Sequence, residues 1–316
     1  MNNNRAAAAA SLVVMMLLSA ACGGAGSGAK PVGGTEHGEH SGNHDSAEHQ
    51  HEKAGRSNGS GGSGIAGGSG GSGTADDEWA SSLQAVWTTV PPSPKAKEKA
   101  TLQLSIEDAE GMPVDKYELN HEKLMHLIIV SEDLQYFDHV HPEYEGEGRF
   151  TVDTTLPSGG RYKLFADFVP SGAAAPITKS SWMEVGGGEQ HQHDHGAHSL
   201  QPDYEQTKVV QGAKIGLTLS STKAGDEAEM MFTLEDEETG KPITTLEPYL
   251  GALGHVVVVS EDTEQYLHSH PISSDGSGPE AAFHTTWPAN SGLYRIWGQF
   301  QWNGEVLVVP FTVKVE

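Results

Sequence analysis

The chain has 316 residues, and 43 acidic residues against 19 basic ones give it a formal net charge of -24. This charge argues against a nucleic-acid partner, because phosphates would be repelled. A single Cys excludes disulfide scaffolds, iron–sulfur clusters and thiolate zinc sites. The length suggests about two domains, and the 17 His are the unusual feature to explain.

Residues 1–21 are predicted to be a lipoprotein signal peptide, because Arg5 precedes an apolar run that is too short to span a bilayer. Residues 17–23 resemble a lipobox, with Ser19 where Leu is more usual and Cys22 as the lipidated residue. The alternative is an ordinary secretory signal with an incidental cysteine. We expect an exported chain, anchored in the cell membrane through a lipid on Cys22 and facing the extracytoplasmic side.

Residues 22–76 are predicted to be a disordered tether rich in His, Gly and Ser. This composition cannot bury enough apolar surface to offset the conformational entropy lost on folding. About 50 such residues reach roughly 40 Å, so the tether would hold the rest of the chain away from the membrane.

The remainder contains an internal repeat. Residues 126–142 recur as 255–271 with eight of seventeen positions identical, and similar flanking segments extend the match. This pattern predicts two domains, 77–187 and 205–316, joined by a His-rich linker at 188–204. At about 110 residues, each domain is long enough for its own core.

Both repeats are predicted to be all-β. Short runs rich in Val, Ile, Thr and aromatic residues alternate with Gly, Pro, Asp and Ser clusters. Examples are 101–106, 126–131, 161–168, 229–234, 255–260, 293–299 and 306–315. We therefore expect two tandem antiparallel β-sandwich domains of about seven strands, with Ig-like and cupredoxin-like topologies both open.

A histidine-bearing hairpin is predicted in each repeat. In the first, 126–131 is apolar on both faces and is expected to be a central strand, followed by an acidic turn at 132–133. A loop symmetric about this turn pairs His126 with His139, and opposed residues share a face with Cβ atoms about 4.5–5.5 Å apart. His141 lies two residues further on the same face. A three-residue or bulged loop would break this pairing.

The same spacing recurs in the second repeat and predicts two metal sites. Three neutral imidazoles in one patch suit copper or zinc, with a fourth position left for water or another ligand. The alternative is that the histidines are hydrogen-bonded core residues and that His-Pro ends a strand. The predicted ligands are His126, His139 and His141 in the first repeat and His255, His268 and His270 in the second.

Candidates for a fourth ligand are weaker. Met125 precedes His126, but Gly254 occupies the equivalent position. Asp153 corresponds to His284, and both are also compatible with solvated strand positions. His121 has no histidine counterpart and is expected at the surface.

Two further clusters of histidines lie outside the repeats, one in the tether and one in the linker. Flexible His-rich tracts with nearby carboxylates typically bind metal ions weakly and with little selectivity. A solvated acidic linker and a pH-responsive segment are the alternatives. The tract histidines are His37, His40, His44, His49, His51, His191, His193, His195 and His198.

The repeated His-x-x-x-Val-Ser-Glu-Asp…His-x-His-Pro motif, with a later Pro-x-x-Gly-x-Tyr pattern, resembles YtkA-like domains. The resemblance covers both repeats but not the tether. It implies exported bacterial β-sandwich modules associated with heavy-metal handling, and it carries over only to the six triad histidines.

These features favour a lipid-anchored extracytoplasmic protein that captures, buffers or delivers copper or zinc at the cell surface. A metal transporter or an oxidase is a possible recipient. The alternative is a surface interaction, adhesion or envelope-assembly module built from Ig-like domains. We expect no enzymatic activity, because no nucleophile, phosphate-loop or paired-carboxylate motif is evident.

Overall fold

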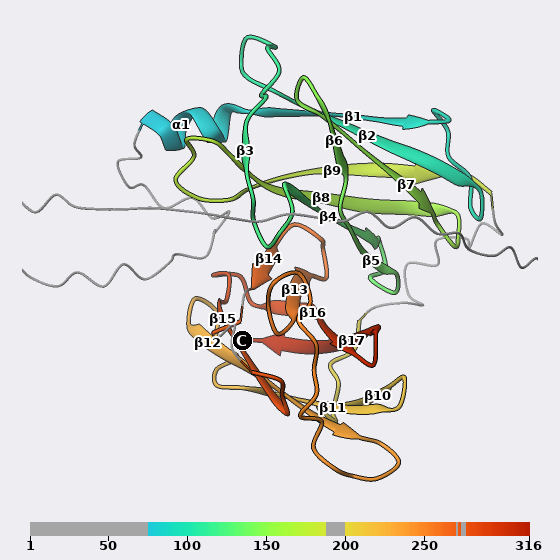
Figure 1. The fold of residues 1–316 in the computed structure, drawn as a ribbon, viewed down its shortest axis with the longest axis vertical. Helices are drawn as coiled ribbons and strands as arrows, with labels where there is room; N and C mark the ends of the chain where they lie inside the picture. Colours follow the sequence, from blue (N-terminus) through green and yellow to red (C-terminus); the bar gives the residue numbers. More distant parts are fainter. Residues whose placement is uncertain (1–74, 188–199, 270, 273–275) are drawn as a thin grey trace, which may run out of the picture. The chain divides into compact units, whose positions relative to one another are not determined.

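The computed structural model describes residues 75–187, 200–269, 271–272 and 276–316, in which the chain forms two tandem β-sandwiches (Figure 1). Each sandwich consists of two antiparallel sheets, and a short helix, α1 (Ala75–Ser82), precedes the first. The predicted all-β class and the architecture of two tandem antiparallel β-sandwiches are confirmed.

In the first repeat, one sheet has the order β1-β2-β7-β6, and the other has the order β3-β8-β4-β5 with β9 also paired to β8. The first sheet contains β1 (Gln84–Val90), β2 (Lys99–Glu107), β6 (Glu143–Gly146) and β7 (Arg149–Thr155). The second contains β3 (Tyr117–Glu118), β4 (Met125–Ser131), β5 (Phe137–Val140), β8 (Gly160–Pro170) and β9 (Ile177–Val185).

The second repeat has sheets of order β10-β11-β12-β15 and β14-β13-β16-β17. The first of these contains β10 (Thr207–Val210), β11 (Ala213–Leu219), β12 (Glu227–Asp236) and β15 (Glu280–Thr286). The other contains β13 (His255–Ser260), β14 (Tyr266–Ser269), β16 (Gly292–Trp302) and β17 (Glu305–Val315). Strands β13, β14 and β16 thus repeat β4, β5 and β8.

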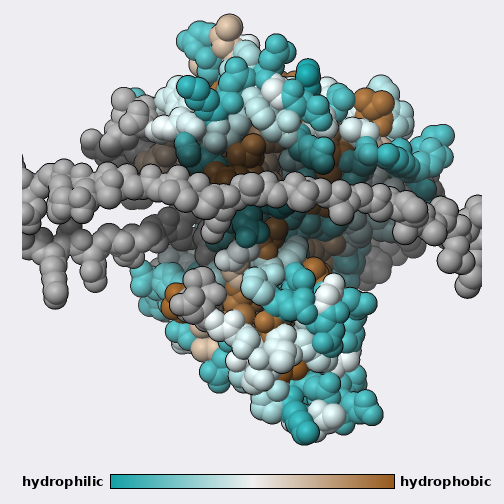
Figure 2. Space-filling view, in the orientation of Figure 1, coloured by the Kyte–Doolittle hydropathy of each residue, from teal (hydrophilic) through white to brown (hydrophobic). Residues whose placement is uncertain are grey.

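Alternation of side chains forms the core of each sandwich. Along β2, Leu102, Leu104 and Ile106 are at most 3% exposed, while the residues between them are half-buried. Such a period of two places one face of a strand in the core. On the face seen in Figure 2, hydrophilic residues predominate and hydrophobic ones form small groups, as expected for solvated outer faces.

Strands β4 and β13 are buried on both faces. Leu127 and Ile129 of β4 pack in the core of the first sandwich, whereas Ile128 and Val130 between them belong to a separate apolar cluster. This inter-repeat cluster consists of Ile128, Val130, Leu134, Phe165, Leu200, Val257, Val259 and Trp297. The prediction of a central strand is confirmed, and the second apolar face of β4 is buried against the other repeat.

The predicted hairpin register is wrong by two residues. The β4–β5 ladder pairs Ile128, not His126, with His139, and the β13–β14 ladder pairs Val257 with His268. The cause is Leu134, which adopts a left-handed conformation (φ 55°) and extends the turn past Asp133. A shift of two residues preserves the face on which each side chain lies, because side chains alternate with period two.

Some predicted segments lie outside the described residues. These are the signal peptide, the tether as far as residue 74 and the linker from 188 to 199. The last two residues assigned to the tether, 75–76, belong instead to α1. Among the described residues, no helix is both long and apolar enough to cross a membrane.

Candidate metal centre

The three predicted ligands of the first repeat lie together. His126 is in β4, His139 is in β5 and His141 follows the end of β5. The β4–β5 ladder ends with Leu127 paired to Val140, and His126 and His141 are the residues that adjoin this last pair. The ring centroids are 4.8 to 5.2 Å apart, and one nitrogen from each ring lies within 4.8 Å of the others.

His126 and His139 each bind a fixed acceptor through one ring nitrogen. Nε2 of His126 lies 2.9 Å from the backbone carbonyl oxygen of Asn120, to which it donates. Nδ1 of His139 lies 2.8 Å from the side-chain oxygen of Gln299 and donates to it. In neutral rings the other two nitrogens, which are 2.9 Å apart, then both carry lone pairs. Facing lone pairs at this distance repel each other unless a proton or a cation lies between them.

Burial keeps this cluster neutral. Loss of solvation is the largest cause that lowers the pKa of His126 and of His139. Burial, together with the neighbouring His126 and Lys123, lowers the pKa of His141 to about 3. Neutral imidazole is the form that binds metal ions, so at neutral pH the cluster is in its ligand form.

The second repeat reproduces the inner pair. Nδ1 of His255 lies 3.3 Å from Nε2 of His268. Nδ1 of His268 lies 3.0 Å from a carboxylate oxygen of Asp167, a buried residue of β8 in the first repeat. His270, the third predicted ligand, lies outside the described residues.

The acceptors on the two repeats occupy equivalent positions. In the strand register, Asp167 of β8 lies opposite His126 of β4, and Gln299 of β16 lies opposite His255 of β13. The β5 histidine is therefore held by the second repeat, and the β14 histidine is held by the first. Hydrogen bonds of this kind, from the outer nitrogen to an oxygen, orient the histidine ligands of metal sites.

Sequence reasoning missed three residues of this cluster. His121 was expected at the surface, but this is wrong: its ring lies 5.0 Å from that of His255 and burial lowers its pKa. It gave no signal because Leu250 occupies the matching loop position in the second repeat. Asp167 and Gln299 were also missed, although a carboxylate within the apolar run 161–168 was a usable signal.

The weaker candidates lie elsewhere. Met125 is fully buried in the core of the first sandwich. Asp153 is exposed and pairs with Lys99 at 2.7 Å, and His284 is exposed on β15, 3.8 Å from Glu227. These two are therefore solvated strand positions. Cys22 and all nine tract histidines lie outside the described residues.

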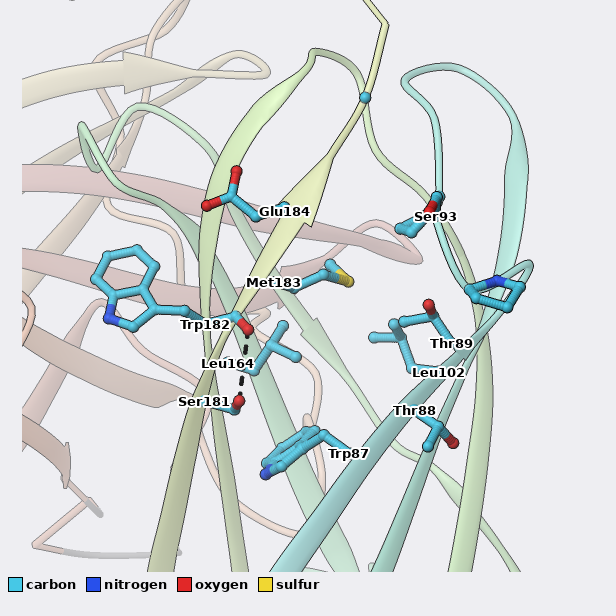
Figure 3. Close-up of a pocket in the computed structure, with 13 residues that line it drawn as sticks. Trp87, Thr88, Thr89, Ser93, Leu102, Leu164, Ser181, Trp182, Met183 and Glu184 are labelled. Carbon is cyan, nitrogen blue, oxygen red and sulfur yellow. Dashed lines mark hydrogen bonds between the residues drawn. The ribbon is translucent and has the colours of Figure 1, made fainter.

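A separate groove lies between β1 and β9 of the first repeat, with a volume of about 700 Å³ (Figure 3). The side chains of Trp87, Leu164 and Met183 line it, whereas the Trp182 ring lies on the other face of β9, 4.1 Å from the Arg161 guanidinium. It contains no histidine among the described residues and forms a mainly apolar concave surface.

One protein-family model matches both repeats. Its description is "Domain of unknown function (DUF8832)", and it matches residues 82–186 and 208–316. No curated protein matches the sequence.

Among solved structures, the chain is similar to the adhesin InvE of Yersinia pseudotuberculosis, with 11% identity over 76% of this chain and 61% of that one and a TM-score of 0.25. It is also similar to a segment of two fibronectin type-III domains from chicken tenascin, with 12% identity over 73% and 97% and a TM-score of 0.21. The chain thus spans less than two thirds of the adhesin. These TM-scores are too low to support a functional argument.

Proposed function

The chain belongs to the DUF8832 family, whose domain it carries twice, and we propose a function for it. In this proposal it is an extracytoplasmic, lipid-anchored protein that captures, buffers or delivers copper or zinc at the cell surface. The observation that carries the proposal is the convergence of His126, His139 and His141, with ligand nitrogens within 4.8 Å of one another.

The hydrogen bonds around the cluster support a cation more strongly than the convergence alone. Asn120 and Gln299 accept hydrogen bonds from the outer N–H groups, so in neutral rings the inner nitrogens of His126 and His139 present lone pairs to each other. A bound ion would replace the repulsion between these lone pairs with two bonds. Burial opposes the competing solution, which is protonation of one ring.

The donor set favours particular metals. Imidazole nitrogen suits copper and zinc, and the hard cations calcium and magnesium prefer oxygen ligands. Nitrogen ligands in the Irving–Williams order favour copper over zinc when both are available.

The remaining parts of the chain fit this role as predictions. The His-rich tracts would gather ions weakly and the folded cluster would hold them more tightly. The lipid on Cys22 would keep the protein at the cell surface, where a transporter or an oxidase is the expected recipient.

The test uses the full chain with all nine tract histidines replaced by Asn, called here the tract-free chain. We expect it to bind Zn(II) and Cu(II), and the variants His126→Asn and His139→Asn to lose at least about tenfold in affinity. His284→Asn is the matched control, because that histidine is exposed and lies on an outer strand. Affinities would be measured by competition with a chelator dye. Absence of tight binding by the tract-free chain would overturn the proposal.

A surface interaction module is the second candidate, and the groove between β1 and β9 is the observation that favours it. The indole of Trp87 lines this groove, and tryptophan is enriched at the energetic centres of protein interfaces. This function predicts that a protein partner binds equally well with and without chelator, and that Trp87→Ala weakens it.

A further inference from the structure

We propose that the protein has one metal centre shared by both repeats, in which a single ion is bound by His126, His139, His255 and His268. The bound ion fastens the two sandwiches to each other. This inference rests on the proposed metal-binding function and changes its stoichiometry from one ion per repeat to one ion per chain.

The four rings are arranged as a metal would arrange them. All six centroid separations among them lie between 5.2 and 6.2 Å: 5.2 and 5.6 Å within a repeat, and 5.3 to 6.2 Å between repeats. A tetrahedral ion with nitrogen ligands at about 2.0–2.1 Å would place the ring centroids roughly 5.2 Å apart. The rings therefore need to close by at most about 1 Å.

The inner nitrogens are also at ligand spacing. Tetrahedral coordination at these bond lengths places ligand nitrogens roughly 3.3 Å apart. The facing nitrogens are 2.9 Å apart in the His126–His139 pair and 3.3 Å apart in the His255–His268 pair.

In each repeat, one side chain accepts a hydrogen bond from a proposed histidine ligand of the other repeat. Gln299 of the second repeat holds His139, and Asp167 of the first repeat holds His268. Neither repeat alone contains all the groups that orient its own pair of imidazoles. Asp167 also places a buried carboxyl group 3.0 Å from His268, and as a carboxylate it would partly neutralise a divalent cation.

The surrounding apolar contacts have the same exchanged pattern. Phe137 stacks on Trp297 with ring centroids 4.7 Å apart, and Phe165 stacks on Tyr266, also at 4.7 Å. Because β13, β14 and β16 repeat β4, β5 and β8, the two stacks are one contact made twice. This is the self-complementary pattern of a two-fold interface, and the metal centre lies among residues of the same strands.

Substitutions in the tract-free chain separate a shared centre from two independent ones. A shared centre predicts one Zn(II) per chain and at least a tenfold loss of affinity in His268→Asn, equal to that in His126→Asn. Independent centres predict that His268→Asn still binds one ion with unchanged affinity. His141→Asn is expected to weaken binding less than His268→Asn, whereas a site formed by the first-repeat triad alone predicts the reverse order.

A spectroscopic measurement does not depend on how much each variant is destabilised. X-ray absorption of the Zn(II) complex is expected to show four imidazole ligands, and three in His268→Asn. Asp167→Asn retains an oxygen acceptor for His268 but removes the charge. We expect it to keep four imidazoles and the same circular dichroism spectrum, with roughly tenfold weaker binding. His284→Asn should match the parent in every measurement.

The outcomes distinguish the two proposals. Two ions per chain, or a His268→Asn variant with unchanged affinity and ligand number, would overturn the shared centre and leave metal binding intact. No binding by the tract-free parent would overturn both.

Discussion

Two side chains determine which nitrogens of the cluster are available to a metal. Asp167 and Gln299 accept hydrogen bonds from the outer nitrogens of His268 and His139, so in neutral rings the inner nitrogens can only accept. In the proposed metal centre, neither side chain is a ligand. They act by fixing the tautomer and the ring orientation, a role whose loss typically costs 10–100-fold in metal affinity.

Burial of the cluster histidines disfavours their protonated form, and this predicts that the stability of the fold depends on pH. Burial lowers the pKa of His126 and His139 below the ordinary value of 6.5, and lowers that of His141 to about 3. Below pH 6.5 the unfolded chain therefore binds more protons than the folded chain, so stability is lost as the pH falls from 6.5 towards 3. In the presence of chelator, the urea midpoint is expected to decrease as the pH is lowered from about 7.5 to about 5.5.

Replacement of one titrating group checks this explanation. His141→Phe should reduce the pH dependence of the urea midpoint, and His284→Asn should leave it unchanged because that side chain is exposed. An identical slope in His141→Phe would show that the dependence comes from other groups.

At the scale of the element, the turn of each histidine-bearing hairpin sets the positions of the histidines on its two strands. Asp133 accepts hydrogen bonds from the hydroxyl of Ser131 and the amide of Gln135, and Asp262 does the same for Ser260 and Glu264. These bonds hold the extended four-residue loop, and the loop fixes the register in which imidazoles of neighbouring strands meet.

Removal of this carboxylate is expected to weaken both fold and site. Asp133→Ala should cost about 1–2 kcal/mol of unfolding free energy, because two hydrogen bonds are lost at an exposed turn. It should also lower metal affinity through the loosened register. Urea denaturation and zinc competition would measure the two effects, and Asp133→Asn, which retains an acceptor, should restore most of each. Equal losses in the Ala and Asn variants would contradict this role.

At the scale of the whole molecule, the inter-repeat cluster joins the two sandwiches through one shared apolar contact. Six of its members come from β4, β8, β13 and β16, while Leu134 lies in the β4–β5 turn and Leu200 precedes β10. Trp297 is 2% exposed and stacks on Phe137, so the folded state of each repeat is stabilised by contact with the other.

Truncation of this tryptophan should uncouple the repeats. Trp297→Ala is expected to cost about 3–5 kcal/mol, as for other buried aromatic truncations, and to divide one calorimetric unfolding transition into two. Trp302→Ala, which removes a half-buried ring packed on the core of the second sandwich, should lower stability without dividing the transition. A single transition in Trp297→Ala would contradict the coupling.

The sequence by itself determined the class of fold, its duplication and the face on which the histidines lie. Strand patterns such as 101–106 have a period of two that only a half-buried strand explains, and they were confirmed. The triad of His126, His139 and His141 converges despite the wrong register, because a shift of two residues conserves the face. These features are local, so periodicity and spacing contain them.

Only the tertiary structure decided which groups cover the outer faces of the histidine-bearing strands and which groups meet the histidines. The apolar runs 126–131 and 255–260 predict burial on both sides, yet nothing in them specifies the other repeat as the covering surface. His121, Asp167 and Gln299 join the cluster from a loop and from strands distant in sequence. Their proximity depends on how two folded sandwiches pack, and side-chain complementarity across that contact has no periodic signature in the chain.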